Sequence, residues 1–217
     1  NIGTPLVEQA ESMPPDAKVV LELSSFQLQL SGERSPHISI ITNITPNHLD
    51  VHASMEEYVE AKKNIFRYQK PGDTVILNYD DPMVRSFAAE APARVVYFSR
   101  SADPGTDTCA LIRDDELVWR YRGQEFPTLK VAELKMLGLH NQENVLAAVA
   151  ACFLAGAPLS AVREIVAQFT GVDSLLRYRK WRIPAIMQVY HHSYTVLVSS
   201  FHYSMYILSC SGYRLLN

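Results

Sequence analysis

Short apolar runs alternate along the chain with longer segments of helical period. The runs at 17–23 (AKVVLEL) and 37–44 (HISIITNI) are rich in β-branched residues, and those at 74–79 and 93–99 are similar. Continuous apolar runs of this length are typical of strands that are buried on both faces of a parallel sheet. The pattern therefore predicts four such strands.

Helical periodicity is clearest at 54–69 (SMEEYVEAKKNIFRYQ), where Tyr58, Lys62 and Phe66 fall on one side. Ser54 is the predicted N-cap of this helix, and Glu57, three residues later, completes a capping box. A short helix and a loop fit between the first two strands. Further helices are predicted over 80–91, with Asp80 or Asp81 as the cap, over 141–155, and over 159–169, with Ser160 as the cap.

Residues 107–131 have a different pattern, with short strands on either side of Asp114-Asp115 and Arg122-Gly123. Pairs of turn residues between such strands predict β-hairpins. Combined with the alternating strands and helices, this predicts a three-layer α/β fold. Its mostly parallel sheet is flanked by helices and carries a small antiparallel appendage.

Composition narrows the function classes only modestly. With 217 residues, 47% of them hydrophobic, the chain can form one large domain, or one domain and part of another. A net charge of −3 gives no reason to expect nucleic acid or an anionic membrane as partner. The three cysteines fit neither a disulfide framework nor a zinc site, which favours a reducing, cytoplasmic location.

Residues 173–217 differ from the rest of the chain, because no acidic residue follows Asp173. From Ile183 to Tyr213 there is no charged residue, yet Ser, Tyr and His interrupt every apolar stretch, which argues against a transmembrane helix. We expect these residues to be a tail that is translated out of frame or is otherwise foreign to the domain. A membrane segment and an unusual native domain are the alternatives.

Polar residues follow two of the predicted strands, where open α/β sheets build their sites. Glu22, with Ser24 close by, could bind Mg²⁺ through hard oxygen atoms or could simply cap a helix. In NITPNHLDVH (43–52), His48, Asp50 and His52 could bind a transition metal and serve a hydrolase, although a solvated polar turn fits their spacing better.

Lys62 lies on the otherwise apolar side of its helix, whereas Lys63 points elsewhere. It could extend its amine to solvent along the helix surface. Alternatively, a buried and neutral amine could react with CO₂ to give a carbamate that binds metal ions. The spacing alone does not distinguish these readings.

Taken together, several motifs resemble the central ATPase domain of the Mur ligase family. They are NIGTPL, LELSSFQL, NITPNHLDVH, EEYVEAKKNIF, VILNYDDP and GLHNQENVLAA. The resemblance covers residues 1–172 and implies a partial central, ATP-binding domain. The form LELSSFQL is similar to the members that add D-glutamate, and another Mur ligase or a folylpolyglutamate synthase is the alternative within this class.

The resemblance implies an ATP- and Mg²⁺-dependent ligase of peptidoglycan precursor synthesis, a monomer when intact, which joins UDP-N-acetylmuramoyl-L-alanine to D-glutamate. Site residues carry over by matching motif positions. The implied metal ligands are Glu22, Ser24, His48 and a carbamylated Lys62, of which His48 and Lys62 are also the implied catalytic residues. Asn141 and Asn144 are implied near the adenine of ATP, and Asn1, Gln27 and Ser24 near the sugar-nucleotide substrate.

The family's phosphate-binding loop, which ends in Gly-Lys-Ser/Thr, would precede Asn1, and no Gly-Lys dipeptide occurs here. The domains that hold uridine and D-glutamate are likewise expected outside this sequence. We therefore expect this polypeptide by itself to lack ligase activity. A noncatalytic remnant or a membrane-tethered module is the alternative from a different class.

Overall fold

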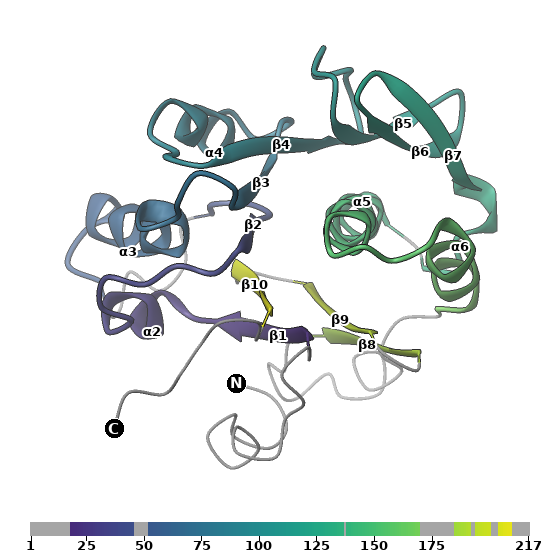
Figure 1. Cartoon of the computed structure of the whole chain (residues 1–217). Coiled ribbons are helices and arrows are strands. Elements are labelled where there is room, and N and C mark those ends of the chain that lie inside the picture. The colour runs from purple at the N-terminus through teal and green to yellow at the C-terminus, as the bar shows by residue number, and fades with distance from the viewer. Residues whose placement is uncertain are drawn as a thin grey trace.

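A computed structural model describes residues 18–45, 52–136 and 138–169, together with the backbone of three later strands. Eight strands form one sheet in the order β1-β10-β2-β3-β4-β5-β6-β7, and β8 pairs with β9 in a separate two-stranded sheet (Figure 1). The strands are β1 Lys18–Leu23, β2 Ile38–Ile41, β3 Thr74–Asn78, β4 Arg94–Ser99, β5 Cys109–Arg113, β6 Glu116–Tyr121, β7 Gln124–Lys130, β8 Ala185–His191, β9 Tyr194–Ser200 and β10 Ser204–Ser209.

The centre of the large sheet is parallel, because β2, β3, β4 and β5 all pair in parallel. Strand β10 lies between β1 and β2 and is antiparallel to both, so β1 runs in the same direction as β2. The carboxyl ends of β1 to β5 consequently share one edge of the sheet. In open α/β sheets this edge is where ligands bind.

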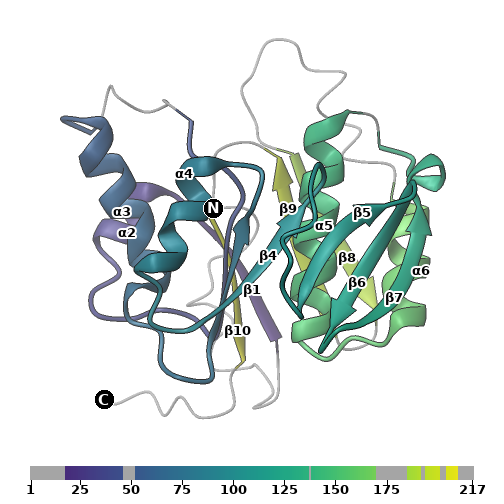
Figure 2. The ribbon, with the colours of Figure 1, turned by 90° about the horizontal axis from the view of Figure 1, so that it is seen from above.

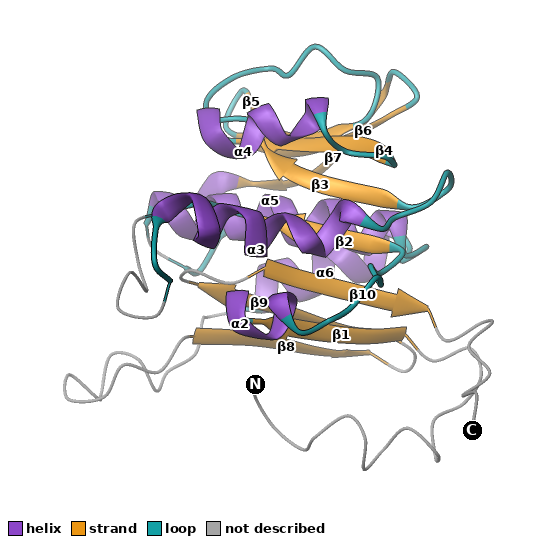
Figure 3. Ribbon diagram, turned by 90° about the vertical axis from the view of Figure 1, so that its left-hand side faces the viewer, coloured by secondary structure: helices purple, strands orange, loops and turns teal. Residues whose placement is uncertain are grey.

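Helices cover both faces of the sheet, as the sequence predicted (Figures 1 and 3). One face packs against α2, α3 and α4, and the other packs against α5 and α6, each with its own apolar cluster. The predicted three-layer α/β fold is therefore confirmed. The helices are α2 Ser25–Gln29, α3 Met55–Arg67, α4 Pro82–Ser86, α5 Leu139–Leu154 and α6 Leu159–Gln168, with 3₁₀ turns η2 Phe87–Ala89 and η3 Val131–Glu133.

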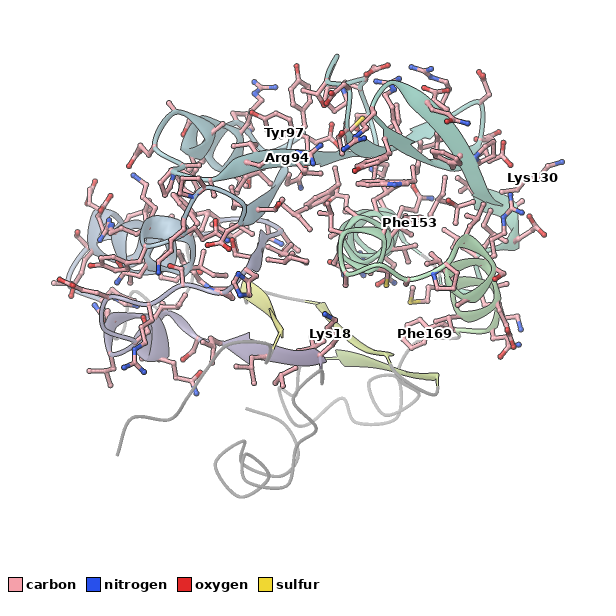
Figure 4. The ribbon with its side chains drawn as sticks, in the orientation of Figure 1. Lys18, Arg94, Tyr97, Lys130, Phe153 and Phe169 are labelled. Carbon is pink, nitrogen blue, oxygen red and sulfur yellow. The ribbon has the colours of Figure 1, made fainter. Side chains whose placement is uncertain are left out.

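The antiparallel appendage is β5-β6-β7, which extends the sheet beyond β4 on the side of α5 and α6 (Figure 2). Its two hairpin turns are those that the sequence predicted, and Asp114, Asp115, Arg122 and Gly123 all have positive φ. Phe153 of α5 stacks on Trp119 of β6 with ring centroids 5.4 Å apart (Figure 4). This contact buries the inner face of the appendage against α5.

Three local predictions need correction. Glu57 does not close a capping box on Ser54, because its carboxylate accepts from the backbone of Ala53, although Ser54 does cap α3. The helix predicted over 80–91 ends after Ser86 and continues only as the turn η2. Ser160 is not the cap of α6: Pro158 occupies that position, and its fixed φ suits a helix start.

Asp81 joins the end of β2 to α4. Its carboxylate accepts from the backbone nitrogens of Met83 (2.9 Å) and Val84 (3.1 Å) and, through the other oxygen, from that of Ile44 (3.2 Å). We expect Asp81→Ala to lower the free energy of unfolding by about 1–2 kcal/mol, because an N-cap and a loop contact are lost together. Urea denaturation measures this. Asp81→Asn keeps an accepting oxygen and should lose less than half as much.

Among the residues that the structure describes, no helix is long and apolar enough to cross a membrane.

Candidate functional site

The turn after β1 contains the residue that caps α2. Ser24 is the N-cap: its hydroxyl accepts from the backbone nitrogen of Gln27 (3.3 Å), and the Gln27 side-chain oxygen accepts from the Ser24 backbone nitrogen (2.9 Å). The side chains of Ser24 and Gln27 thus accept from two backbone N–H groups that have no partner within the helix. Glu22, one residue before the end of β1 and only 4% exposed, is not used as a cap.

Lys62 is buried on the inner side of α3, with 2% of its surface exposed. Burial lowers the pKa of its amine to about 7, and the negative charge of Glu22 partly opposes this shift. Its nitrogen lies 5.7 Å from the centre of the Tyr58 ring. This burial excludes an amine that extends to solvent. The effect of Glu22 on the pKa also means that Lys62 and Glu22 lie close together inside the protein.

Lys63, the next residue, provides an internal comparison. Its side chain is 11% exposed, and its amine donates to the half-exposed carboxylates of Glu60 (2.9 Å) and Glu90 (2.7 Å). Burial lowers the pKa of Lys63, but these two carboxylates together outweigh that effect and raise it, so the amine stays charged. Of the two neighbouring lysines, only Lys62 has the low pKa that makes a neutral, nucleophilic amine available near pH 7.

Burying a lysine next to a carboxylate destabilises a fold, because both groups lose their hydration. Such a pair is therefore a candidate for a functional role. A neutral amine can take up CO₂ to form a carbamate, which exchanges the amine for an oxygen-bearing anion. Beside Glu22, such a group would add oxygen atoms of the kind that Mg²⁺ prefers. Ser24, two residues after Glu22 in the chain, carries a further hydroxyl oxygen. The described residues contain no cluster of three or more His, Cys, Asp or Glu side chains that could hold a metal ion.

His52 lies beside this turn and is 3% exposed. Its Nε2 shares a hydrogen bond of 2.7 Å with the hydroxyl of Ser25, and its ring stacks on Phe26 with centroids 5.2 Å apart. From the sequence, His52 was predicted only as one of three possible metal ligands, and Ser25 was not singled out. The sequence signal that could have identified Ser25 and His52 is their position, because each lies in or beside a segment that carries predicted site residues.

Asn141 and Asn144 lie one turn apart at the start of α5, as predicted, and Asn144 is buried. Glu143, between them, pairs with Arg100 just after β4 (Nε to Oε1, 3.5 Å). Asp80 fixes that segment by accepting from the Arg100 backbone nitrogen (2.7 Å). The start of α5 therefore lies at the carboxyl end of β4, on the same edge of the sheet as Glu22.

Three of the candidate site residues, Asn1, His48 and Asp50, lie outside the described residues. Their roles stay predictions. The domain boundary predicted near 172 also falls outside the described ranges, and the structure leaves it untested.

Comparison with known proteins gives a consistent result. The Mur ligase middle domain family model matches residues 5–152. UDP-N-acetylmuramoylalanine--D-glutamate ligase of Symbiobacterium thermophilum is 68% identical over 173 residues, which are 80% of this chain and 38% of that protein. The protein of the same name from Acetivibrio thermocellus is 47% identical over 173 residues, 80% of this chain and 36% of its own length. The chain thus spans less than two fifths of these relatives.

Solved structures with a similar fold were also found. MurF from Acinetobacter baumannii is 21% identical with a TM-score of 0.49, and the match covers 69% of this chain and 33% of that one. The murein peptide ligase mpl from Psychrobacter arcticus is 19% identical with a TM-score of 0.49, over 64% of this chain and 28% of that one.

Proposed function

Since this chain belongs to the Mur ligase middle domain family, we propose that it forms the nucleotide-binding core of an ATP-dependent ligase that joins D-glutamate to UDP-N-acetylmuramoyl-L-alanine. The observation that carries the proposal is the buried Lys62 next to Glu22 at the carboxyl end of β1. The names of the two most similar relatives reported above support the choice of substrates.

The proposed reaction has two steps. A carboxylate oxygen of UDP-N-acetylmuramoyl-L-alanine attacks the γ-phosphorus of ATP, which releases ADP and leaves an acyl phosphate. The amine of D-glutamate then attacks the acyl carbon, and inorganic phosphate leaves as the amide forms. In phosphoryl transfer the protein contributes mainly by positioning and by stabilising charge.

The residues divide into three groups along one edge of the sheet. Glu22, Ser24 and a carbamylated Lys62 supply oxygen ligands for Mg²⁺, with His48 as a further ligand. When bound, Mg²⁺ neutralises charge on the phosphoryl oxygens. Asn141 and Asn144 bind adenine, since α5 starts at the carboxyl end of β4. Gln27, Ser24 and Asn1 bind the sugar-nucleotide substrate near the reacting carboxylate.

The carbamate is the part of this proposal that the chain itself can test. In buffer with ¹³C-labelled bicarbonate, we expect one carbamate carbon signal from the wild type by NMR. Lys62→Ala should abolish it. Lys63→Ala is the matched control and should retain it, because Lys63 is charged and paired with Glu60 and Glu90.

Metal binding gives a second readout. We expect Mg²⁺ to raise the melting temperature of the wild type only when bicarbonate is present, because the carbamate is one of its ligands. Glu22→Gln should remove this response. A carbamate signal that survives in Lys62→Ala, or Mg²⁺ stabilisation that is independent of both bicarbonate and Glu22, would contradict the proposal.

A further inference from the structure

A compact aromatic and polar contact joins the turn after β1 to the segment before α3. His52 shares its 2.7 Å hydrogen bond with Ser25, stacks nearly parallel on Phe26, and meets the ring of Tyr58 edge-on at 5.3 Å. Ser25 and Phe26 belong to α2, whereas Tyr58 lies on α3. We call these four residues, Ser25, Phe26, His52 and Tyr58, the His52 clasp.

The short Ser25–His52 distance would fit a nucleophile and its general base. Both side chains, however, are almost completely buried, at 2% and 3% exposure. The imidazole ring stacks on Phe26, meets Tyr58 edge-on, and is bonded to Ser25 through Nε2. No substrate can reach the hydroxyl of Ser25, so this pair is built to hold elements together.

Each end of the clasp is next to a residue of the proposed site. Ser25 directly follows Ser24 and is three residues after Glu22, whereas the ring of Tyr58 contacts the amine of Lys62 at 5.7 Å. Tyr58 and Lys62 are four residues apart, which places them on one face of α3. A movement of His52 would therefore be transmitted to both sides of the site at once.

A second link runs parallel to the clasp at the protein surface. Glu57 of α3 accepts from the side chain of Gln29 in α2 (3.2 Å) and from the backbone of Ala53 (2.8 Å). Both of these contacts are exposed, so each contributes less than a buried hydrogen bond between desolvated groups. Asn64 of α3 also donates to the carbonyl oxygen of Leu28 in α2 (3.2 Å), and Leu28 packs in one apolar cluster with α3. The contact through His52 differs from these because it is a buried hydrogen bond to the residue next to Ser24.

We infer that His52 is a positioning residue, which locks the turn bearing Glu22 and Ser24 onto the helix bearing Lys62. The inference rests on the proposed function for the importance of these three residues. It assigns His52 no direct contact with substrate or metal. His52 keeps the turn that bears Glu22 and Ser24 at a fixed distance from Lys62. A functional site requires this of the residues that support it.

Three substitutions test the hydrogen bond of the clasp. His52→Phe keeps the ring contacts with Phe26 and Tyr58 but removes the hydrogen bond, and Ser25→Ala removes the same bond from the other side. His52→Gln places a polar atom close to the position of Nε2 and should restore part of it. Because Ser25 and His52 share one interaction, the double variant should be no worse than either single variant.

The first measurement is hydrogen exchange of the full chain by mass spectrometry. We expect exchange to become about fivefold faster in both 24–30 and 53–58 in His52→Phe and Ser25→Ala, the factor for a hydrogen bond worth about 1 kcal/mol. His52→Gln should lie closer to the wild type. Faster exchange in only one of the two segments, or evenly over the whole chain, would overturn the inference.

The second measurement is the ¹³C carbamate signal, which a merely structural contact would leave unchanged. We expect it to fall about fivefold in His52→Phe and to recover partly in His52→Gln. An undiminished signal despite faster local exchange would show that the clasp does not position the site, and would overturn the inference. Absence of the signal from the wild type would instead contradict the proposed role of Lys62, and hydrogen exchange alone would then decide the clasp.

Discussion

Replacing Lys62 with methionine is expected to make the protein more stable at neutral pH, not less. Methionine has a similar length and needs no hydration, whereas the amine of Lys62 is buried with a pKa of about 7. At about 1.4 kcal/mol per pKa unit, the shift from 10.5 corresponds to about 5 kcal/mol. Glu22 loses its opposite charge in the variant, so we expect a net gain of about 2 kcal/mol.

The pH dependence follows from the direction of this shift. Between pH 7 and 10.5 the amine binds a proton more readily in the unfolded chain than in the folded one. The free energy of unfolding of the wild type therefore rises with pH across this window. The Lys62→Met variant lacks this contribution, so its advantage should be largest at pH 7 and below and should disappear near pH 10.5.

Urea denaturation in CO₂-free buffer at a series of pH values measures both effects. The double variant Glu22→Gln, Lys62→Met is the control, because it also removes the carboxylate that the single variant leaves without its partner. It should be at least as stable as Lys62→Met. A Lys62→Met protein that is less stable than the wild type at pH 7 would show that the amine is not desolvated as the structure indicates.

The main elements of the fold could be predicted because each is recorded locally in the sequence. Strand β3, for example, is buried at every position, so its pattern is not mixed with that of a solvent-exposed side. The turns at Asp114-Asp115 and Arg122-Gly123 contain residues that tolerate positive φ. Both kinds of signal act within a few residues, where chain sterics and burial decide the outcome.

Errors arose where a tertiary contact overrides a local preference. Glu57 is placed correctly for a capping box, yet its carboxylate bridges Ala53 and Gln29 of another helix. Asp80, the other candidate cap of the helix after β3, instead accepts from the backbone nitrogens of Arg100 and Ser101. That helix starts after its predicted cap Asp81, but it ends after Ser86 and continues only as η2. Partners that lie 20 to 40 positions away leave no mark in a local pattern.

The candidate site was partly predictable for the same reason. Glu22 and Lys62 were recognisable as polar residues in apolar surroundings, and their proximity follows from the strand and helix on which they lie. Ser25 and His52 carried no such signal, because a serine after a helix cap and a histidine in a polar loop are common. Only the packing of α2 on α3 makes these two residues partners.

Removing Arg120 is the second change for which a large effect is expected. Arg120 lies on β6 and is 11% exposed in its side chain. It donates to both oxygens of Asp103 (2.8 and 2.7 Å) and to Glu125 (3.0 and 2.7 Å). These bonds fasten the segment between β4 and β5 to the appendage. Arg120→Met should cost about 2–3 kcal/mol, since two partly exposed carboxylates lose the more buried of the two arginines that they share.

The matched control is Arg113, which contacts the same two carboxylates from a side chain that is 39% exposed. Arg113→Met should cost no more than about 1 kcal/mol, because exposed ion pairs contribute little. The pH dependence provides a further check. Arg120 holds the pKa of Asp103 well below its usual value of 3.8, so this stabilisation is present above pH 3.8 and is lost as the pH falls below it. The difference in stability between the wild type and Arg120→Met should therefore shrink in acid, and a difference that stays constant from pH 7 to pH 3 would show that Arg120 acts through packing instead of charge.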